Sequence, residues 1–271
     1  MHFGATLRLL RMEAGISLRD LAGRIGVSGA YLSRVENGHD GSPTPDRLIA
    51  IADALGLPRA VLVELARQAG PAVDGYLQRT PEAGSLFLDI ARRGLQGPQI
   101  ARIKAFLDAE FPLPAGEVQT HRLVDLLPAS RVVIGVSCSD LEDLVSVAAS
   151  RLGDEVDARV VVQRVLARER EQPTAIGGGF AVLHVALEPK AEPVVETAVM
   201  LTLAQPFALA TPDQRAIRVV FLLIYGPDRR ARLELVTRVA RLASYDIADE
   251  LCAAASAEQA RAIVERVESL W

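Results

Sequence analysis

The segment from Val27 to Gly38 constrains the fold more than any other stretch of the 271 residues. Ser28 is a favourable N-cap, because its hydroxyl can accept a hydrogen bond from an amide of the first helical turn. Gly38 can end the helix, since glycine adopts the left-handed conformation at little cost. Leu32 and Val35 recur at helical spacing and are expected to face inward. A short helix is therefore predicted. The residues on its outward side are Gly29, Ala30, Ser33 and Arg34.

The chain around this segment is also expected to be helical, without an alternating strand pattern up to residue 65. A first helix is expected to stop near Gly15, and Ser17 then caps a second one. After Pro43-Thr44-Pro45 a fourth helix is predicted to end at Gly56, and a fifth is predicted over residues 58–65. Two short helices joined by a glycine-containing turn, with further helices packed on them, form a helix-turn-helix arrangement.

Four motifs in this region occur in the order and spacing of a known family. They are residues 16–22 (ISLRDLA), 25–28 (IGVS), 31–38 (YLSRVENG) and 51–56 (IADALG). Together they resemble the Cro/cI-like (XRE) repressor family. The resemblance implies a lambda-repressor-like, all-α domain over residues 1–70 in which the helix within residues 27–38 reads a double-stranded DNA operator.

The same resemblance assigns positions on that helix to DNA contacts. Gly29, Ala30 and Arg34 occupy base-facing sites, and Asn37 is placed for a phosphate. Arg34 could donate two hydrogen bonds to guanine, and the methyl group of Ala30 could contact the methyl group of thymine. Gly29 contributes no side chain, so Arg34 carries most of the direct readout.

Leu18 stands where many family members carry glutamine, so a polar contact is missing at the start of the second helix. Arg19, or Arg47 on the fourth helix, is expected to supply backbone contacts instead. A different interpretation makes residues 1–70 a protein-interaction module in which Arg34 is only a solvated charge. The residues predicted to bind DNA are Arg19, Ser28, Gly29, Ala30, Ser33, Arg34, Asn37 and Arg47.

Charge and cysteine content limit the function further. The whole chain carries a net charge of -4, and residues 1–70 hold eight arginines against seven carboxylates, so one copy should bind DNA weakly and a homodimer is expected.

Two isolated cysteines, without a CxxC pair or clustered histidines, give no reason to expect a metal site or another cofactor. With no signal peptide and no apolar run long enough to span a bilayer, we expect a cytoplasmic protein.

Residues 71–120 are predicted to be a helical connector. A linker is expected at 71–80, followed by apolar residues at helical spacing over 85–95 and 98–107. Two interpretations stay open for the apolar side chains, which either form a dimer interface or pack on their own domain. These side chains are Leu86, Phe87, Ile90, Ile103 and Phe106.

Residues 121–271 change to a mixed pattern. Strands are predicted at 132–136 and within the apolar runs 180–187, 197–203 and 217–225. Asp140 is expected to cap a helix, another covers 160–166, and the segment 230–270 is helical again. Helices on either side of a mixed sheet make an α/β sandwich.

One histidine in this half stands in a distinctive context. Gly177, Gly178 and Gly179 permit a tight turn before a strand, which would bring His184 to a site lined by main-chain amides. Together with Arg168-Glu169 and the 232–240 helix, these residues resemble the fructose/mannitol/nitrogen-type enzyme IIA domain of the bacterial phosphotransferase system. In that family the matching histidine is phosphorylated by the phosphocarrier HPr or its nitrogen-branch counterpart.

The resemblance implies roles for three residues over the span 121–271. His184 would accept the phosphoryl group, and Arg168 would hold its oxygens with its planar set of donors. Arg232 stands where the family has a second histidine, and Leu183 and Val185 replace the family's proline and glycine around the acceptor. Those departures keep open the possibility that His184 is left over from a degenerate site.

The combined interpretation is a transcriptional regulator rather than an enzyme, with an operator-binding dimer controlled by phosphorylation or anion binding at His184. The alternative is a working phosphoryl carrier that passes phosphate to a transporter and has an accessory DNA-binding domain.

Overall fold

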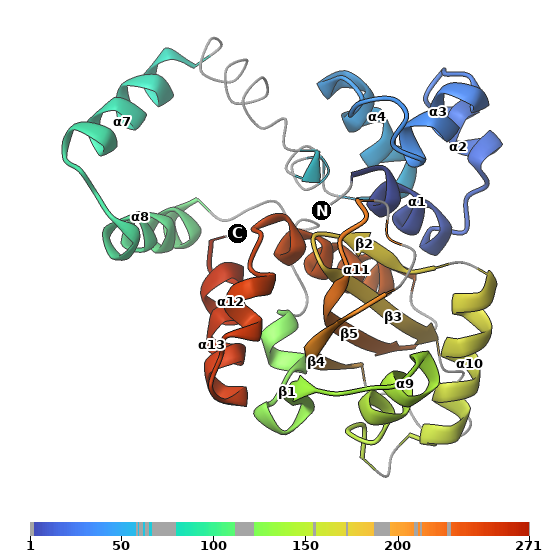
Figure 1. Ribbon diagram of the computed structural model, residues 1–271. Helices are drawn as coiled ribbons and strands as arrows, with labels where there is room; N and C mark the ends of the chain where they lie inside the picture. The colour runs from blue at the N-terminus through green and yellow to red at the C-terminus, as the bar shows by residue number, and fades with distance from the viewer. Residues whose placement is uncertain are drawn as a thin grey trace.

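The computed structural model describes most of the chain in three parts (Figure 1). The described residues are 3–57, 59, 62, 65–66, 80–111, 122–153, 156–171, 173–186, 196–208, 211, 213–226 and 229–270. Most of the predicted fifth helix, the linker at 71–79 and the segment 112–121 lie outside these ranges. Among the described residues, no helix is long and apolar enough to cross a membrane.

The N-terminal part is a helix-turn-helix arrangement with the expected caps. Its helices are α1 (Phe3–Glu13), α2 (Leu18–Arg24), α3 (Gly29–Glu36) and α4 (Pro45–Leu55). The Ser17 hydroxyl accepts from the amide of Asp20, and the Ser28 hydroxyl accepts from the amide of Tyr31. The α4 helix ends at Gly56, as predicted, and Gly56 adopts the left-handed conformation.

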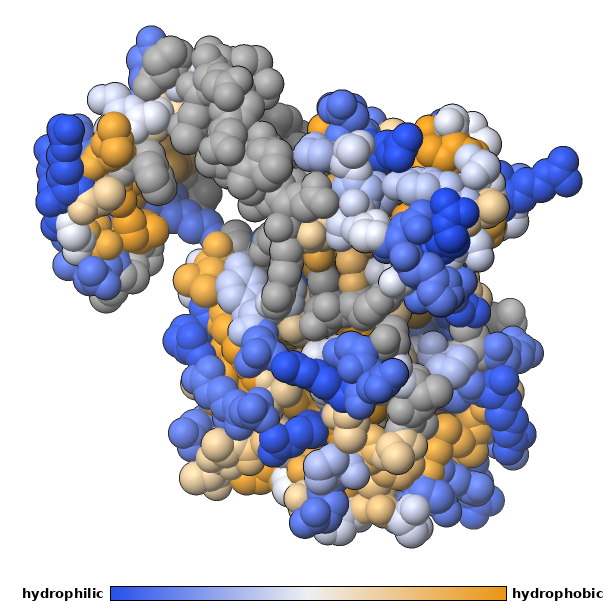
Figure 2. Space-filling view, turned by 45° about the horizontal axis from the view of Figure 1, so that its top comes forward, coloured by the Kyte–Doolittle hydropathy of each residue, from blue (hydrophilic) through white to orange (hydrophobic). Residues whose placement is uncertain are grey.

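Two helices form a separate lobe next to the rest of the molecule (Figure 1). They are α7 (Pro81–Arg92) and α8 (Gly97–Glu110). Leu86 and Phe106 are more than half exposed, whereas Ile90 and Ile103 are half-buried. Figure 2 shows apolar residues gathered on this lobe.

The C-terminal part is an α/β sandwich around a mixed five-stranded sheet. The strands are β1 (Val132–Val136), β2 (Ala175–Gly177), β3 (Phe180–Ala186), β4 (Thr197–Phe207) and β5 (Ile217–Tyr225). The helices are η1 (Leu123–Leu126), η2 (Ala129–Arg131), α9 (Leu141–Ala149), α10 (Ala158–Glu171), α11 (Arg229–Ser244), α12 (Ala248–Cys252) and α13 (Ala257–Glu268). The β2 strand was not predicted, and β4 runs beyond the predicted end at residue 203.

The strand order is β1-β4-β5-β3-β2. β1 pairs with β4 and β3 with β5 in parallel, while β4 with β5 and β2 with β3 are antiparallel. Because side chains alternate along a strand, β3 sends Leu183 to the face covered by α9 and α10, and Val182 to the face covered by α11 to α13. His184 is two residues after Val182 on β3, so its side chain lies on the same face of the sheet.

The N-terminal helices share an apolar core with this second face of the sheet. One contiguous cluster includes Leu7 and Leu10 of α1 together with Phe221 of β5 and Val236 of α11. The α1 helix therefore packs both within the helix-turn-helix and against the α/β sandwich.

α1 is closely joined to α3. A methyl group on Gly4 would overlap the carbonyl oxygens of Val35 and Glu36, so only glycine allows this approach. In addition, Arg11 donates from Nε to Oε1 of Glu36 at 2.6 Å and from Nη2 to Oε2 at 2.9 Å, with both side chains buried. A buried two-point ion pair of this kind fixes the relative orientation of the two helices.

Candidate functional site

His184 lies on β3 and is buried, with 1% of its surface exposed. Its Nδ1 is 2.7 Å from the carbonyl oxygen of Val182. Because a carbonyl can only accept, Nδ1 carries a proton and donates it. In the neutral ring this leaves the lone pair on Nε2, the nitrogen that faces the remaining groups of the site.

Two groups of opposite charge approach that Nε2 atom. Nε of Arg168, from the last turn of α10, lies 3.0 Å away, and Oε1 of Glu13, from the last residue of α1, also lies 3.0 Å away. Nη2 of Arg168 donates to the same Glu13 oxygen. Nε2 has a single bonding position, so it either accepts from Arg168 or, when protonated, donates to Glu13.

Two further residues complete the surroundings of the Glu13 carboxylate. The Tyr225 hydroxyl at the end of β5 donates to Oε2 at 3.0 Å. Arg232 on α11 places Nε 3.2 Å from Oε2 and donates from Nη2 to the main-chain oxygen of Glu13 at 2.6 Å. We call Arg168, His184, Tyr225 and Arg232 the anion site.

The anion site strongly favours a negative charge. Burial by itself raises the pKa of Glu13, but hydrogen bonding and charge from His184, the charge of Arg168 and the Tyr225 hydroxyl outweigh it and bring that pKa to about 2. Burial, with the nearby Glu13 carboxylate, raises the pKa of the Tyr225 phenol, so it stays a donor. The carboxylate is therefore ionised, although only 4% of its side chain is exposed.

The segment between α10 and β3 is held in place by Glu169. This buried side chain accepts from the amide of Thr174 at 3.0 Å and also from the Thr174 hydroxyl, while burial raises the pKa of its carboxyl group. The expected glycine turn exists, because residues 177–179 all have positive φ angles. It lies at the opposite end of β3 from His184, so its amides do not line the histidine; side chains and the Val182 carbonyl do.

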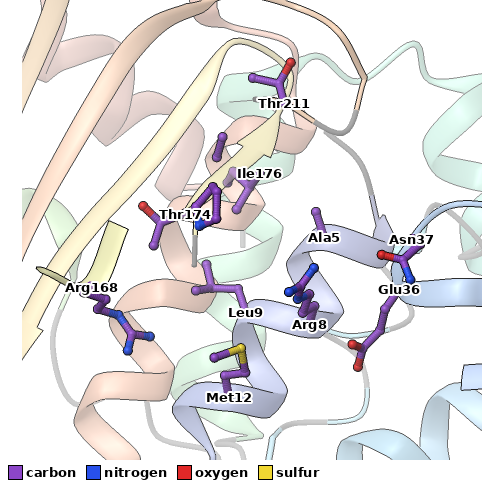
Figure 3. Close-up of a pocket in the computed structure, with 12 residues that line it drawn as sticks. Ala5, Arg8, Leu9, Met12, Glu36, Asn37, Arg168, Thr174, Ile176 and Thr211 are labelled. Carbon is purple, nitrogen blue, oxygen red and sulfur yellow. The ribbon is translucent and has the colours of Figure 1, made fainter. Parts of the chain in front are cut away.

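A cavity of about 290 Å³ adjoins the anion site between α1 and the β2 region (Figure 3). Arg168 lines one side of the cavity, and Arg8 of α1 is another of its lining residues. The Arg168 side chain is 32% exposed. Other lining residues are Ala5, Leu9, Met12 and Thr174.

The residues predicted to bind DNA gather on and around α3. Ser28, Ala30, Arg34 and Asn37 are exposed there, and Gly29 and Ser33 are half-buried. These side chains belong to one short helix and its two ends, so they form one surface.

Local contacts determine how the polar side chains of that surface are held. Arg34 donates from Nε to both oxygens of Asp40 at 3.1 Å, and Asn37 donates from Nδ2 to the Ser33 carbonyl at 2.8 Å. The Arg47 guanidinium lies 4.9 Å from the centre of the Tyr31 ring. Arg19 is exposed on α2. The Asp40 contact means that Arg34 has to change partner to reach a base.

Sequence reasoning found three members of the anion site and missed two participants. Arg168, His184 and Arg232 are brought together as expected. Tyr225 was predicted only as the end of a strand. Because that strand, β5, pairs with β3, the position of Tyr225 could have indicated that it lies near His184. Glu13 gave none, because it lies 171 residues from His184 and in another domain.

Comparisons with known proteins agree with this two-part structure. Residues 2–65 match the family described as "Helix-turn-helix domain", and residues 125–267 match "Phosphoenolpyruvate-dependent sugar phosphotransferase system, EIIA 2". The chain is 38% identical over 81 residues to the HTH-type transcriptional repressor RghR of Bacillus subtilis, covering 30% of this chain and 54% of that one. It thus spans about half the length of that relative.

Two further similarities fall in the C-terminal half. The chain is 31% identical over 131 residues to the nitrogen regulatory protein of Klebsiella oxytoca, covering 48% of this chain and 78% of that one. The crystal structure of nitrogen regulatory protein IIA-Ntr from Neisseria meningitidis aligns with a TM-score of 0.47 and 23% identity, covering 52% of this chain and 97% of that one.

Proposed function

Because the chain belongs to the EIIA 2 family of the phosphoenolpyruvate-dependent sugar phosphotransferase system and carries a helix-turn-helix domain, we propose that it is a DNA-binding transcriptional regulator controlled by phosphorylation of His184. One observation carries the proposal. His184 is buried with Nδ1 donating to a carbonyl, and its Nε2 lies 3.0 Å from Nε of Arg168 and 3.0 Å from the Glu13 carboxylate, which Arg232 also contacts.

The donors in the site suit an anion larger than a carboxylate. Nε of Arg232 is buried and makes no hydrogen bond within the described part of the chain, although it lies 3.2 Å from Oε2 of Glu13. A phosphoryl group presents three oxygens, whereas a carboxylate presents two. The third oxygen gives this donor a partner, and buried donors are rarely left without one.

The chemistry assigned to His184 is nucleophilic attack by Nε2. Its lone pair forms a bond to the phosphorus of a phosphohistidine on a phosphocarrier protein, while the phosphorus–nitrogen bond of the donor breaks and its electron pair stays on the donor ring. Arg168 and Arg232 stabilise the charge on the phosphoryl oxygens during transfer. The Val182 carbonyl keeps the proton of the His184 ring on Nδ1.

We assign operator recognition to the surface of α3. Arg34 reads guanine, Ala30 contacts a thymine methyl group, and Asn37 with Arg19 and Arg47 contacts the DNA backbone. The exposure of these residues supports the assignment. With so little direct readout, DNA shape and a second subunit contribute to specificity.

The second subunit is proposed to associate through the lobe of α7 and α8. Six of the eight most exposed large apolar residues of the described chain lie on it: Leu86, Leu88, Ile100, Phe106, Leu107 and Phe111. A second copy would bury these side chains and place two α3 helices together. Helix-turn-helix dimers need their half-sites about one DNA turn apart, so a shift of a few Å between the subunits changes operator affinity.

The phosphorylation experiment uses the full chain with phosphoenolpyruvate, enzyme I and a phosphocarrier. We expect an acid-labile, base-stable phosphoryl label on wild type, no label on His184→Gln, and full label on His39→Gln, which removes an exposed histidine outside the site. Label that persists in His184→Gln, or its absence from wild type with a competent donor, would refute the assignment.

The DNA-binding experiment selects operators from genomic fragments and measures affinity against salt concentration. Arg34→Ala is expected to weaken selected sites by about 1 to 3 kcal/mol and to relax specificity at one position. Arg59→Ala removes the same charge from another exposed ion pair with an aspartate and serves as the control. Equal losses in the two variants would contradict base reading by Arg34.

The dimer experiment measures mass by sedimentation of the full chain. Leu86→Asp combined with Phe106→Asp is expected to give monomers, whereas Leu270→Asp, an exposed leucine outside the lobe, should leave the mass unchanged. A wild type that is monomeric at operator-binding concentrations would exclude this interface.

A further inference from the structure

The carboxylate of Glu13 occupies the place where a phosphoryl group on His184 would lie. All hydrogen-bond and ion-pair partners of its side chain within the described chain belong to the α/β sandwich, and they are the four residues of the anion site. Glu13 is the last residue of α1. Within the described chain, its side chain makes no hydrogen bond or ion pair to the helix-turn-helix and instead occupies the anion site of the α/β sandwich.

We propose that Glu13 is the internal occupant of the phosphoryl site, that it docks the N-terminal helices on the EIIA-like domain, and that this docking and phosphorylation of His184 exclude each other. The proposal rests on the function assigned above to His184. It identifies what phosphorylation changes in this chain, namely the attachment of α1.

Steric exclusion follows from the geometry at Nε2. Oε1 of Glu13 already lies at hydrogen-bonding distance, 3.0 Å, and a phosphorus atom bonded covalently to Nε2 would lie closer than that in the same direction. In the docked state Nε2 is also engaged by either Arg168 or Glu13, so no free lone pair is available for attack. Glu13 must leave before the phosphorus–nitrogen bond can form.

The charges in the site also oppose binding of Glu13 and a phosphoryl group at the same time. With Glu13 docked, one carboxylate lies between the guanidinium groups of Arg168 and Arg232. A phosphoryl group brings up to about two negative charges. Glu13 and the phosphoryl group together would exceed the positive charge of the two arginines, and like charges repel strongly where Glu13 and His184 are almost fully buried.

Release of Glu13 would affect DNA binding through α1. The close approach at Gly4 and the Arg11–Glu36 pair keep α1 on α3, so the helix-turn-helix leaves as one body. Because α3 keeps its reading surface exposed in the docked state, the change lies in how freely the DNA-binding domain is oriented. Coupling of this kind is reciprocal in free energy, so docking disfavours the phosphorylated state by as much as phosphorylation weakens docking.

The test compares Glu13→Gln with Asp46→Asn, which removes an exposed negative charge from the same domain away from the site. With the phosphocarrier as donor, we expect His184 of Glu13→Gln to be labelled about tenfold faster than that of wild type or Asp46→Asn, within the usual range of coupling. Glu13→Asp keeps the charge on a shorter side chain, so its His184 should be labelled at a rate between those of wild type and Glu13→Gln. This variant controls for misfolding.

A second measurement follows docking without any phosphoryl donor. Hydrogen exchange of peptides from α1 and from β3 should rise in Glu13→Gln but not in Asp46→Asn, and phosphorylation of wild type should reproduce that rise. Equal labelling rates, or exchange unchanged by the substitution, would overturn the proposal while leaving phosphorylation of His184 intact. If no variant accepts label, the proposed function fails, and the exchange comparison alone decides whether Glu13 docks α1.

Discussion

Glutamine at position 13 is predicted to remove a pH-dependent contribution to stability. The pKa of Glu13 is about 2, against the ordinary value of 4.5. Every tenfold difference in proton affinity between folded and unfolded chains corresponds to about 1.4 kcal/mol, so the difference between these pKa values is worth about 3 kcal/mol.

The direction follows from the lowered pKa. The contribution of the carboxylate is complete well above pH 4.5, because the folded and unfolded chains are then both ionised at Glu13. It declines as the pH falls from 4.5 towards 2, because the unfolded chain takes up the proton first. Glu13→Gln is therefore expected to be about 3 kcal/mol less stable than wild type at pH 6 and nearly equal to it at pH 2.

The assay is urea unfolding followed by circular dichroism at a series of pH values between 2 and 6. The groups that face Glu13 are His184, Arg168, Tyr225 and Arg232, and both proteins contain all four. A stability difference that stays constant over this pH range, or its absence at pH 6, would refute the reasoning from burial and charge.

Three other substitutions test the N-terminal domain. Gly4→Ala should cost about 1 to 3 kcal/mol in urea unfolding, since its methyl group overlaps carbonyl oxygens of α3; wild-type stability would contradict that approach. Arg11→Ala should cost about 3 to 5 kcal/mol by leaving Glu36 buried without its partner, and Arg11→Ala combined with Glu36→Gln should recover part of the loss, also by urea unfolding. Asp40→Ala frees Arg34, so DNA affinity should rise and its salt dependence should steepen by about one counterion; unchanged titrations would count against a competing ion pair.

Local features were predictable from sequence because they depend on residues a few positions apart. The caps at Ser17, Ser28 and Asp140 each involve a hydroxyl or carboxylate and an amide three residues later. The Ile217–Tyr225 strand follows from an apolar run with both faces buried. The three-residue strand β2 has no such signal, because its pairing depends on the turn that joins it to β3.

The candidate site was only partly predictable for a related reason. The fold family implied the histidine and its arginines, since each lies on a recognisable segment of the α/β sandwich. The carboxylate of Glu13 enters from a domain for which it is only the last residue of a helix. Nothing in the residues around Glu13 distinguishes a solvated charge from one that fills a distant site, and only the packing of α1 on α11 and β2 decides between them.

The close approach at Gly4, together with the Arg11–Glu36 pair, would make α3 follow α1 when Glu13 leaves the anion site. Gly4 and Glu13 lie at opposite ends of α1, about 14 Å apart at the rise of an α-helix. If α1 reorients after Glu13 is released, each tilt of about 10° over this length would move one end of the helix relative to the other by about 2 Å. In the proposed dimer, such a movement in each subunit would change the spacing of the two α3 helices, on which binding to two half-sites depends.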